Sequence, residues 1–181
     1  LIALAKAQPG RISIASGGTG ATTHLAAELL QSYAGIKLNH VPYKGAGPAM
    51  TDVVAGQVPV TFTTMATAAP FVKSGRVRIL GVTSAKRLAA FPNVPTFSES
   101  GVPMIFEHWW GVMAPAGVPK PIVEKLHAHI AKAVEAPDVR ERFAALAVEP
   151  RITTPEAFRQ LLVSDLKRWA KVVKDAGIKP E

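Results

Sequence analysis

Short strand-like segments and amphipathic helical segments alternate through the first part of this chain, and only a few residues connect each pair. Residues 11–15 alternate polar and apolar side chains, and residues 37–41 and 58–64 are further strand candidates. The helical segments between them end at Gly35 and Gly56, since glycine is favoured just beyond the end of a helix. Because strands that alternate with helices are typical of βαβ units, the sequence predicts an α/β fold with a mostly parallel sheet.

Further elements can be predicted in this first part. In the first helix, Leu25, Leu29 and Tyr33 recur every four residues, and we expect them to form its buried stripe. Residues 78–83 are apolar enough to form another buried strand. Residues 87–103 are polar and rich in proline, which indicates a surface connection.

The last third of the chain has a mainly helical pattern. Residues 105–113 predict one long strand, and apolar side chains at helical spacing then run through residues 122–146. The last helix is expected to begin where Thr153 and Glu156 have the spacing of a capping box, and to end at Gly177.

The composition excludes several classes of protein. Hydrophobic side chains make up 48% of the 181 residues, but no run approaches the roughly 18 apolar residues of a membrane span. Cysteine is absent, which excludes disulfides, thiolate metal sites and a cysteine nucleophile. The net charge of +8 comes from basic residues interleaved with acids, as on solvated helix faces, so no nucleic-acid partner is expected. The positive charge can instead attract anionic ligands over a distance.

The chain begins inside a structural element. Residues 1–7 have the pattern of the end of a helix, which Pro9 and Gly10 terminate. Neither an initiator Met nor a signal peptide precedes them. We therefore expect this chain to be a piece of a longer protein.

The strongest local signal is the run Ser-Gly-Gly-Thr-Gly that starts at Ser16, between the first strand and the first helix. Gly18 and Gly20 allow a tight turn and let backbone N–H groups approach a ligand. The N-terminus of the helix adds unpaired N–H donors and the positive end of the helix dipole, and both favour an anion. The hydroxyls of Ser16, Thr19 and Thr22 can either cap this helix or bind the oxygens of the anion.

More specialised chemistry finds no support in the sequence. The glycine run lacks the third glycine of the dinucleotide fingerprint, and no Gly-Lys-Ser/Thr phosphate loop is present. The five histidines lack metal-ligand spacing, so we expect neither a metal nor a cofactor. Glu28 and Asp52 are the only acids between residues 10 and 85, and Gly-x-Ser-x-Gly is absent, so no catalytic residue is assigned. An anion cradle without catalytic groups favours binding without turnover.

Two other segments are expected to reach the same site. Tyr43 and Lys44 form the turn after the second strand, and Thr61, Thr63 and Thr64 end the third. The carboxyl ends of parallel strands meet at one edge of the sheet, where ligands bind, so Tyr43, Lys44 and Thr63 join the candidate ligand-binding residues. Tyr43 can equally well cover the sheet edge, and the threonines can be ordinary strand formers.

Taken together, these segments resemble the receptors of tripartite tricarboxylate transporters, often called Bug receptors. No single segment is specific, but the matching set follows the order of the family along nearly the whole chain. It comprises residues 16–20 with His24, 41–45, 74–78, 82–84, 87–96, 110–111, 115–117, Leu126 and 155–169.

The resemblance implies the fold of a two-lobed periplasmic binding protein that closes on its ligand. Residues 1–104 would form the second, α/β lobe, and residues 105–181 would return as a strand and helices to complete the first lobe, whose N-terminal part is not in this chain. It also implies a periplasmic solute-binding receptor that captures a small carboxylate and delivers it to the membrane subunits of a transporter. The carboxylate would bind on residues 16–22, with Tyr43 and Thr63 shaping the rest of the site.

Two other functions stay open. A ligand-sensing effector module of a regulator shares the two-lobed fold, and a DNA-binding motif upstream would favour it. An α/β transferase would need a general base near Thr19, for which His24 and His40 are the candidates. If the sheet of the first lobe is incomplete, its open edge can also lead copies of the chain to associate.

Overall fold

The computed structural model describes residues 1–178 and divides the chain into two compact units. One unit contains Leu1–His108 together with the chain from Lys167 onward, and the other contains Trp109–Leu166. The assignment of residues 1–104 and 105–181 to two lobes stays a prediction, and residues 179–181 of the second segment lie outside the described part. None of the helices in residues 1–178 combines the length and apolar character that a membrane crossing needs.

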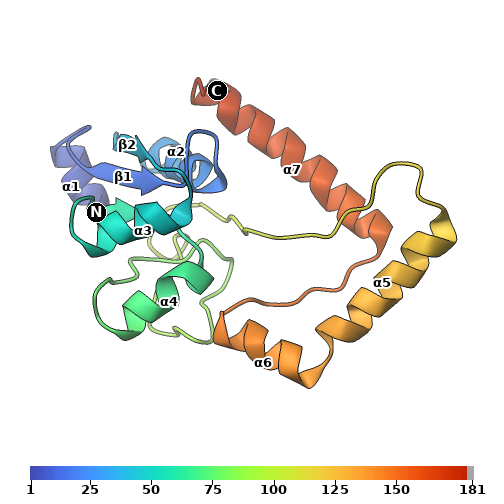
Figure 1. Ribbon diagram of the computed structural model, residues 1–181. Helices are drawn as coiled ribbons and strands as arrows, with labels where there is room; N and C mark the ends of the chain where they lie inside the picture. Colours follow the sequence, from blue (N-terminus) through green and yellow to red (C-terminus); the bar gives the residue numbers. More distant parts are fainter. Residues whose placement is uncertain (179–181) are drawn as a thin grey trace. The chain divides into compact units, whose positions relative to one another are not determined.

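The first unit is built on a three-stranded parallel sheet with the order β2-β1-β3. The strands are β1 (Ser13–Ser16), β2 (Asn39–Pro42) and β3 (Val60–Thr61). The helices of this unit are α1 (Ile2–Ala7), α2 (Thr22–Ala34), α3 (Ala46–Val54) and α4 (Met65–Lys73), of which α4 lies beside α3 (Figure 1). The predicted helix at residues 1–7, the predicted order of strands and helices, and the parallel pairing are confirmed.

The two outer strands are shorter than predicted. Lys37 and Leu38 do not join β2, because the Lys37 carbonyl accepts from Gly10 and the Leu38 N–H donates to Gln31. The ladder begins instead with the Asn39 N–H, which donates to the Ile12 carbonyl at 2.8 Å. Pro59 has no N–H to donate, and β3 starts only after it.

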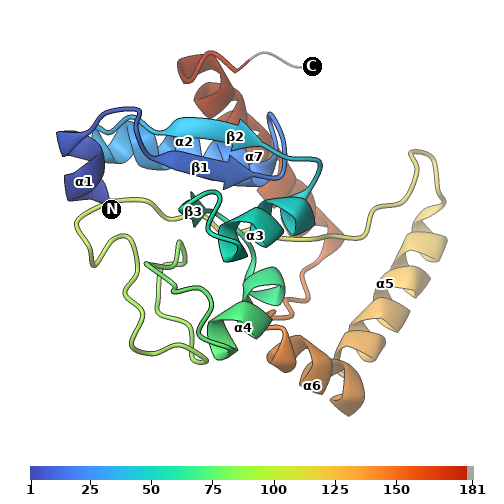
Figure 2. The ribbon, with the colours of Figure 1, turned by 60° about the vertical axis from the view of Figure 1, so that its left-hand side comes forward.

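Successive residues of β1 point to opposite faces of the sheet and so serve two different cores. Ile14 packs in a cluster with Ala26, Ala27 and Leu30 of α2, whereas Ala15 packs with Ala49 of α3 and with Val58. The helices α2 and α3 therefore cover opposite faces, an arrangement that can be followed in Figure 2.

The buried face of α2 differs from the predicted stripe. Leu25 is buried as expected and Leu29 packs partly buried against the core, but Tyr33 is exposed. The rest of the buried face is formed by His24, Ala26, Ala27 and Leu30. Small alanine side chains let the helix approach the sheet closely, so the core needs fewer large residues than the sequence periodicity suggests. The helix ends as predicted at Gly35, which has a left-handed φ of 59°.

The predicted strand at residues 78–83 is wrong. Only an isolated parallel bridge forms there, between Val82 and Thr96. The Val82 N–H donates to Pro95, and the Phe97 N–H donates back to Val82. Since Pro95 has no N–H, the ladder cannot extend past it.

The predicted strand at residues 105–113 is wrong as well. Val102, Met104 and Phe106 alternate into the core like strand residues, and the Phe106 N–H donates to the Thr83 carbonyl at 2.8 Å. Beyond Phe106 no strand within the described part of the chain lies alongside, so an extended segment is present without a sheet. Phe106 also meets Trp169 edge to face, with ring centroids 5.0 Å apart.

The second unit is helical, as predicted, with α5 (Lys120–Val134), α6 (Pro137–Ala145) and the first part of α7 (Pro155–Asp175). The predicted capping box of Thr153 and Glu156 is wrong, because the residue whose hydroxyl caps α7 is Thr154. The Thr154 hydroxyl accepts from the Ala157 N–H, while the Thr153 carbonyl lies 2.8 Å from Nε2 of His127.

Candidate functional site

The loop between β1 and α2 is where the predicted ligand-binding residues concentrate. Ser16 ends β1 and is fully buried, Thr22 is half-buried at the start of α2, and Thr19 is exposed between them. The Tyr43 N–H donates to the Ser16 carbonyl at 3.0 Å and the Gly45 N–H to the Gly17 carbonyl at 3.1 Å. The structure thus brings the loops after β1 and β2 together, as parallel neighbouring strands require.

Thr63 lies just beyond β3 and therefore at the same edge of the sheet. Its hydroxyl oxygen is buried and has no hydrogen-bond partner among residues 1–178. A buried hydroxyl without a partner is unfavourable. Among the predicted ligand-binding residues, Thr63 therefore has a hydroxyl that can still donate to and accept from another group.

Glycine is required in this loop for two separate reasons. Gly18 has φ 129°, and a Cβ there would lie 3.2 Å from the Tyr43 carbonyl oxygen, so both its conformation and its space exclude a side chain. Gly20 has φ 75° with open space around it, so only the backbone conformation demands glycine. The close contact of Gly18 sets the distance between the two loops.

Several N–H groups of the loop are held by the protein itself. Gly17 donates to the Thr23 hydroxyl at 2.9 Å, Gly18 to the Ser16 hydroxyl at 3.1 Å, and Gly20 to Nδ1 of His24 at 3.0 Å. These bonds fix the loop without using any ligand. Thr23, which the sequence did not single out, turns out to be one of the residues that shape it.

Other N–H groups of the same turn have no acceptor. The backbone N–H groups of Thr19, Thr22, Thr23 and His24 donate to nothing within residues 1–178. The N-cap of α2 is Ala21, and no side chain caps it, so the capping role that the sequence allowed for Ser16, Thr19 and Thr22 is wrong. An uncapped helix N-terminus with free N–H donors favours an anion.

His24 and His40 meet directly behind the loop. Their rings stack with centroids 3.8 Å apart and planes within 3° of parallel. Burial, and then the neighbouring His24, lower the pKa of His40 below the ordinary value of 6.5. From the sequence, His24 was expected to be a packing or hydrogen-bonding residue rather than a base, and its bond to Gly20 agrees with that. His40 was considered only as a possible base, and the contact between the two rings was not predicted.

Ser16 and His40 have the separation of a nucleophile and its base, 2.6 Å between Oγ and Nε2. However, Ser16 is 0% exposed and its oxygen already accepts the Gly18 N–H. A substrate carbonyl cannot reach this oxygen, so the pair does not support the transferase alternative.

Tyr43 and Lys44 play different parts. The Tyr43 hydroxyl donates to Asp52 at 2.7 Å, and this hydrogen bond to the carboxylate raises the pKa of Tyr43 above its ordinary value. Its ring packs on the small core under α3. Tyr43 therefore reaches the loop after β1 with its backbone N–H, while its ring and hydroxyl are engaged elsewhere. Lys44 is exposed beside it.

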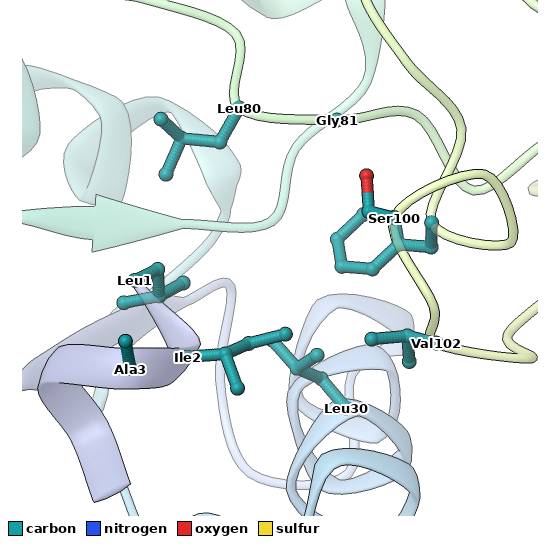
Figure 3. A pocket seen from close by; sticks show the side chains of 9 residues that line it. Leu1, Ile2, Ala3, Leu30, Leu80, Gly81, Ser100 and Val102 are labelled. Atoms are coloured by element: carbon teal, nitrogen blue, oxygen red, sulfur yellow. The ribbon is translucent and has the colours of Figure 1, made fainter.

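The described part of the chain contains no cluster of three or more His, Asp or Glu side chains that could hold a metal ion. It does contain a cavity of about 370 Å³ in the first unit, lined mainly by apolar side chains (Figure 3). Leu1 and Ile2 of α1, Leu30 of α2, and Leu80 and Val102 from two loops surround it. None of the predicted ligand-binding residues lines this cavity, so it is not the site described above.

A family model described as "Tripartite tricarboxylate transporter family receptor" matches residues 1–178. Among curated proteins, "Protein BugT" of Bordetella pertussis is 38% identical over 180 residues, which is 99% of this chain and 55% of BugT. The chain spans about half the length of most of the curated relatives it matches.

Solved structures agree with the family match. The Rhodopseudomonas palustris protein Rpa4515 with adipate superposes with a TM-score of 0.90 at 31% identity, covering 99% of this chain and 60% of that one. "Periplasmic binding protein BugD" gives 0.88 at 33% identity, with coverages of 99% and 61%. MatC of R. palustris with bound malate gives 0.81 at 29% identity, with coverages of 95% and 60%. The predicted fold class, an α/β fold of the periplasmic-binding-protein type with a parallel sheet, is confirmed.

Proposed function

The chain belongs to the tripartite tricarboxylate transporter receptor family, and on that premise we propose that it is part of a solute-binding receptor for a small carboxylate. The site is the loop between β1 and α2 with its neighbours after β2 and β3. The receptor would act in the periplasm and pass its ligand to the membrane subunits of a transporter.

One observation carries this proposal: the N–H groups of Thr19, Thr22, Thr23 and His24 form an uncapped set of donors at the start of α2. A carboxylate accepts hydrogen bonds only, so it matches a site made of donors. Such charge-assisted bonds are shorter and stronger than those between neutral groups. The net charge of +8 adds a favourable long-range field for an anion.

The relatives support a dicarboxylate as the class of ligand. Adipate and malate, found with Rpa4515 and MatC, are both dicarboxylates. We propose that one carboxylate of such a ligand binds at the start of α2, and that the Thr63 hydroxyl donates to the ligand directly or through a water molecule. Lys44, exposed at the mouth of the site, supplies a cation that favours the approach of a dianion.

The proposed mechanism is capture without chemical change. The ligand carboxylate satisfies donors that otherwise contact only water, and a second lobe closes over it. Because Ser16 is buried and engaged, the site holds a ligand and offers no exposed nucleophile from this pair.

Thermal unfolding of the full-length protein in the presence of mono-, di- and tricarboxylates tests the proposal. A ligand at about 100 times its dissociation constant adds about 2.7 kcal/mol to the free energy of unfolding, which is a readily measured shift in Tm. Failure of every small carboxylate to raise Tm would contradict the proposal.

A matched pair of variants localises the site. Gly20 and Gly117 both have positive φ and open space, at 75° and 87°, so alanine strains the backbone alike at both positions. Gly20→Ala is expected to weaken binding about tenfold or more, because the donors around it move, whereas Gly117→Ala should leave the affinity unchanged. Equal affinities in the two variants would place the ligand elsewhere.

A further inference from the structure

The two stacked histidines hold the two sides of the glycine loop. His24 accepts the Gly20 N–H on Nδ1, 3.0 Å away. His40 contacts Oγ of Ser16 at 2.6 Å, and the same oxygen accepts the Gly18 N–H. The ring contact of 3.8 Å joins these two attachments into one assembly behind the loop.

The bond to Gly20 is possible only for one protonation state of His24. A backbone N–H always donates, so Nδ1 must be the unprotonated nitrogen of a neutral imidazole. The proton of that ring is then on Nε2, which lies 3.5 Å from a Glu28 carboxylate oxygen. Protonation of Nδ1 would make two N–H donors face each other, and the hydrogen bond from Gly20 to His24 would be lost.

The two stacked rings resist being charged at the same time. A proton added to either ring of a parallel pair 3.8 Å apart is repelled as soon as the other ring is charged. The charged group that contacts the pair within residues 1–178 is Glu28, which faces Nε2 of His24 and also accepts from Gln31. On the other side, His40 meets the neutral hydroxyl of Ser16.

We infer that His24 and His40 are positioning residues that hold the glycine loop in its binding shape, and that the bond to Gly20 requires a neutral His24 ring, so that carboxylate binding weakens as the pH falls. This inference rests on the proposed carboxylate site. It assigns to the histidines a role in which they shape the loop and do not contact the ligand.

The sign of the pH effect separates this role from a direct one. A histidine that touched the carboxylate, or acted on it only through charge, would strengthen binding when protonated, since an imidazolium attracts an anion. A histidine that holds the loop must weaken binding instead, because its protonation releases Gly20. Over the range in which histidines titrate, the two roles predict opposite slopes.

Three variants isolate the contributions. His24→Asn keeps an acceptor near the position of Nδ1 but cannot titrate, and His24→Leu removes the acceptor. His129→Gln is the matched control, because His129 is an exposed histidine of the second unit. Circular dichroism at each pH confirms that the samples compared remain folded.

The backbone amide of Gly20, followed by NMR in the unliganded full-length protein, gives a readout that needs no ligand. Between pH 8 and pH 5 its resonance should move in the native protein and in His129→Gln and stay in place in His24→Asn. A Gly20 resonance that ignores pH in the native protein, or moves equally in His24→Asn, would overturn the inference.

Calorimetric titration with adipate and with malate at pH 7.5 and pH 5.5 gives the second readout. We expect about threefold to tenfold weaker binding at the lower pH in the native protein, which corresponds to the loss of about one hydrogen bond. The loss should be clearly smaller in His24→Asn, where only the partial protonation of the ligand itself remains. Binding that tightens at pH 5.5 would overturn the inference. If neither ligand binds at either pH, that result counts against the proposed function, and the Gly20 resonance still decides the role of the histidines.

Discussion

The two compact units of this chain bury their side chains to very different extents. In the first unit, Ile14, Ala26 and Leu30 are at most 1% exposed and α2 alone contributes five buried residues. In the second unit, α5 and α6 contain no buried residue, and Ile122 and Leu126 are half exposed. Both units have apolar side chains at helical spacing, so periodicity alone does not say whether a helix is buried within its own unit.

The rigidity of the candidate site comes from the buried core of the first unit. The loop from Ser16 to Thr22 is fixed on β1, whose two faces are covered by α2 and α3. A site held on a closed core can keep its N–H donors oriented before a ligand arrives, which favours binding. The second unit offers no comparable support from its own residues.

The largest difference is expected between two leucine truncations. Leu30→Ala empties a fully buried position and should lower the free energy of unfolding by about 2–5 kcal/mol. Leu126 is 50% exposed, so Leu126→Ala should cost within about 0.5 kcal/mol. Urea denaturation measures both. Equal losses would show that α5 is buried in a way that the structure of its own unit does not reveal.

A glycine substitution probes the packing around Phe158 in the second unit. A Cβ at Gly111 would clash with the Phe158 ring, and that ring also packs edge to face on Trp109. Gly111→Ala should therefore cost about 1–3 kcal/mol of unfolding free energy, the usual effect of overpacking. Near-UV circular dichroism should show the disturbed tryptophan as well. An unchanged spectrum and stability would mean that Phe158 moves aside freely.

Gly47→Ala is the opposite case, in the first unit. Gly47 lies in the first turn of α3 with nothing near its missing Cβ, but it precedes Pro48, whose ring disfavours a helical conformation for a preceding residue that has a Cβ. This cost offsets the higher helix propensity of alanine, so Gly47→Ala should change the free energy of unfolding by no more than about 0.5 kcal/mol. Thermal unfolding measures the change, and a larger loss of stability would contradict the open space around Gly47.

The smallest effect expected is a pH dependence of stability from His40. Its pKa is lowered in the folded chain, so the unfolded chain binds the proton more readily and stability falls as the pH drops below about 6.5. His40→Phe keeps an aromatic ring for the stack and should flatten this slope between pH 7 and pH 5. Part of the slope should remain, because burial also lowers the pKa of His108. A slope that His40→Phe leaves unaltered would contradict the account.

The sequence predicted the local elements of the first unit well because each has its own signal. Gly35 and Gly56 mark helix ends, and the alternation around Ile14 marks a strand. Residues 78–83 and 105–113 had equally good strand patterns and are not strands, because a strand depends on a partner that local sequence does not specify.

The site was predictable only in part for a similar reason. The glycine run, the free helix N-terminus and the convergence of Tyr43 with Ser16 follow from local pattern and parallel topology. The bond of Tyr43 to Asp52 and the stacking of His24 on His40 depend on side-chain contacts between separate elements. Such contacts leave no fixed spacing in the sequence.

The most direct test of the carboxylate site is an amide NMR titration of the full-length protein with adipate or malate. The account predicts that the N–H resonances of Thr19, Thr22, Thr23 and His24 move downfield together as their free donors acquire an acceptor, while those of Gly17 and Gly18, already bonded, move less. Saturable binding that leaves those four resonances in place would contradict the assignment of the carboxylate to the start of α2.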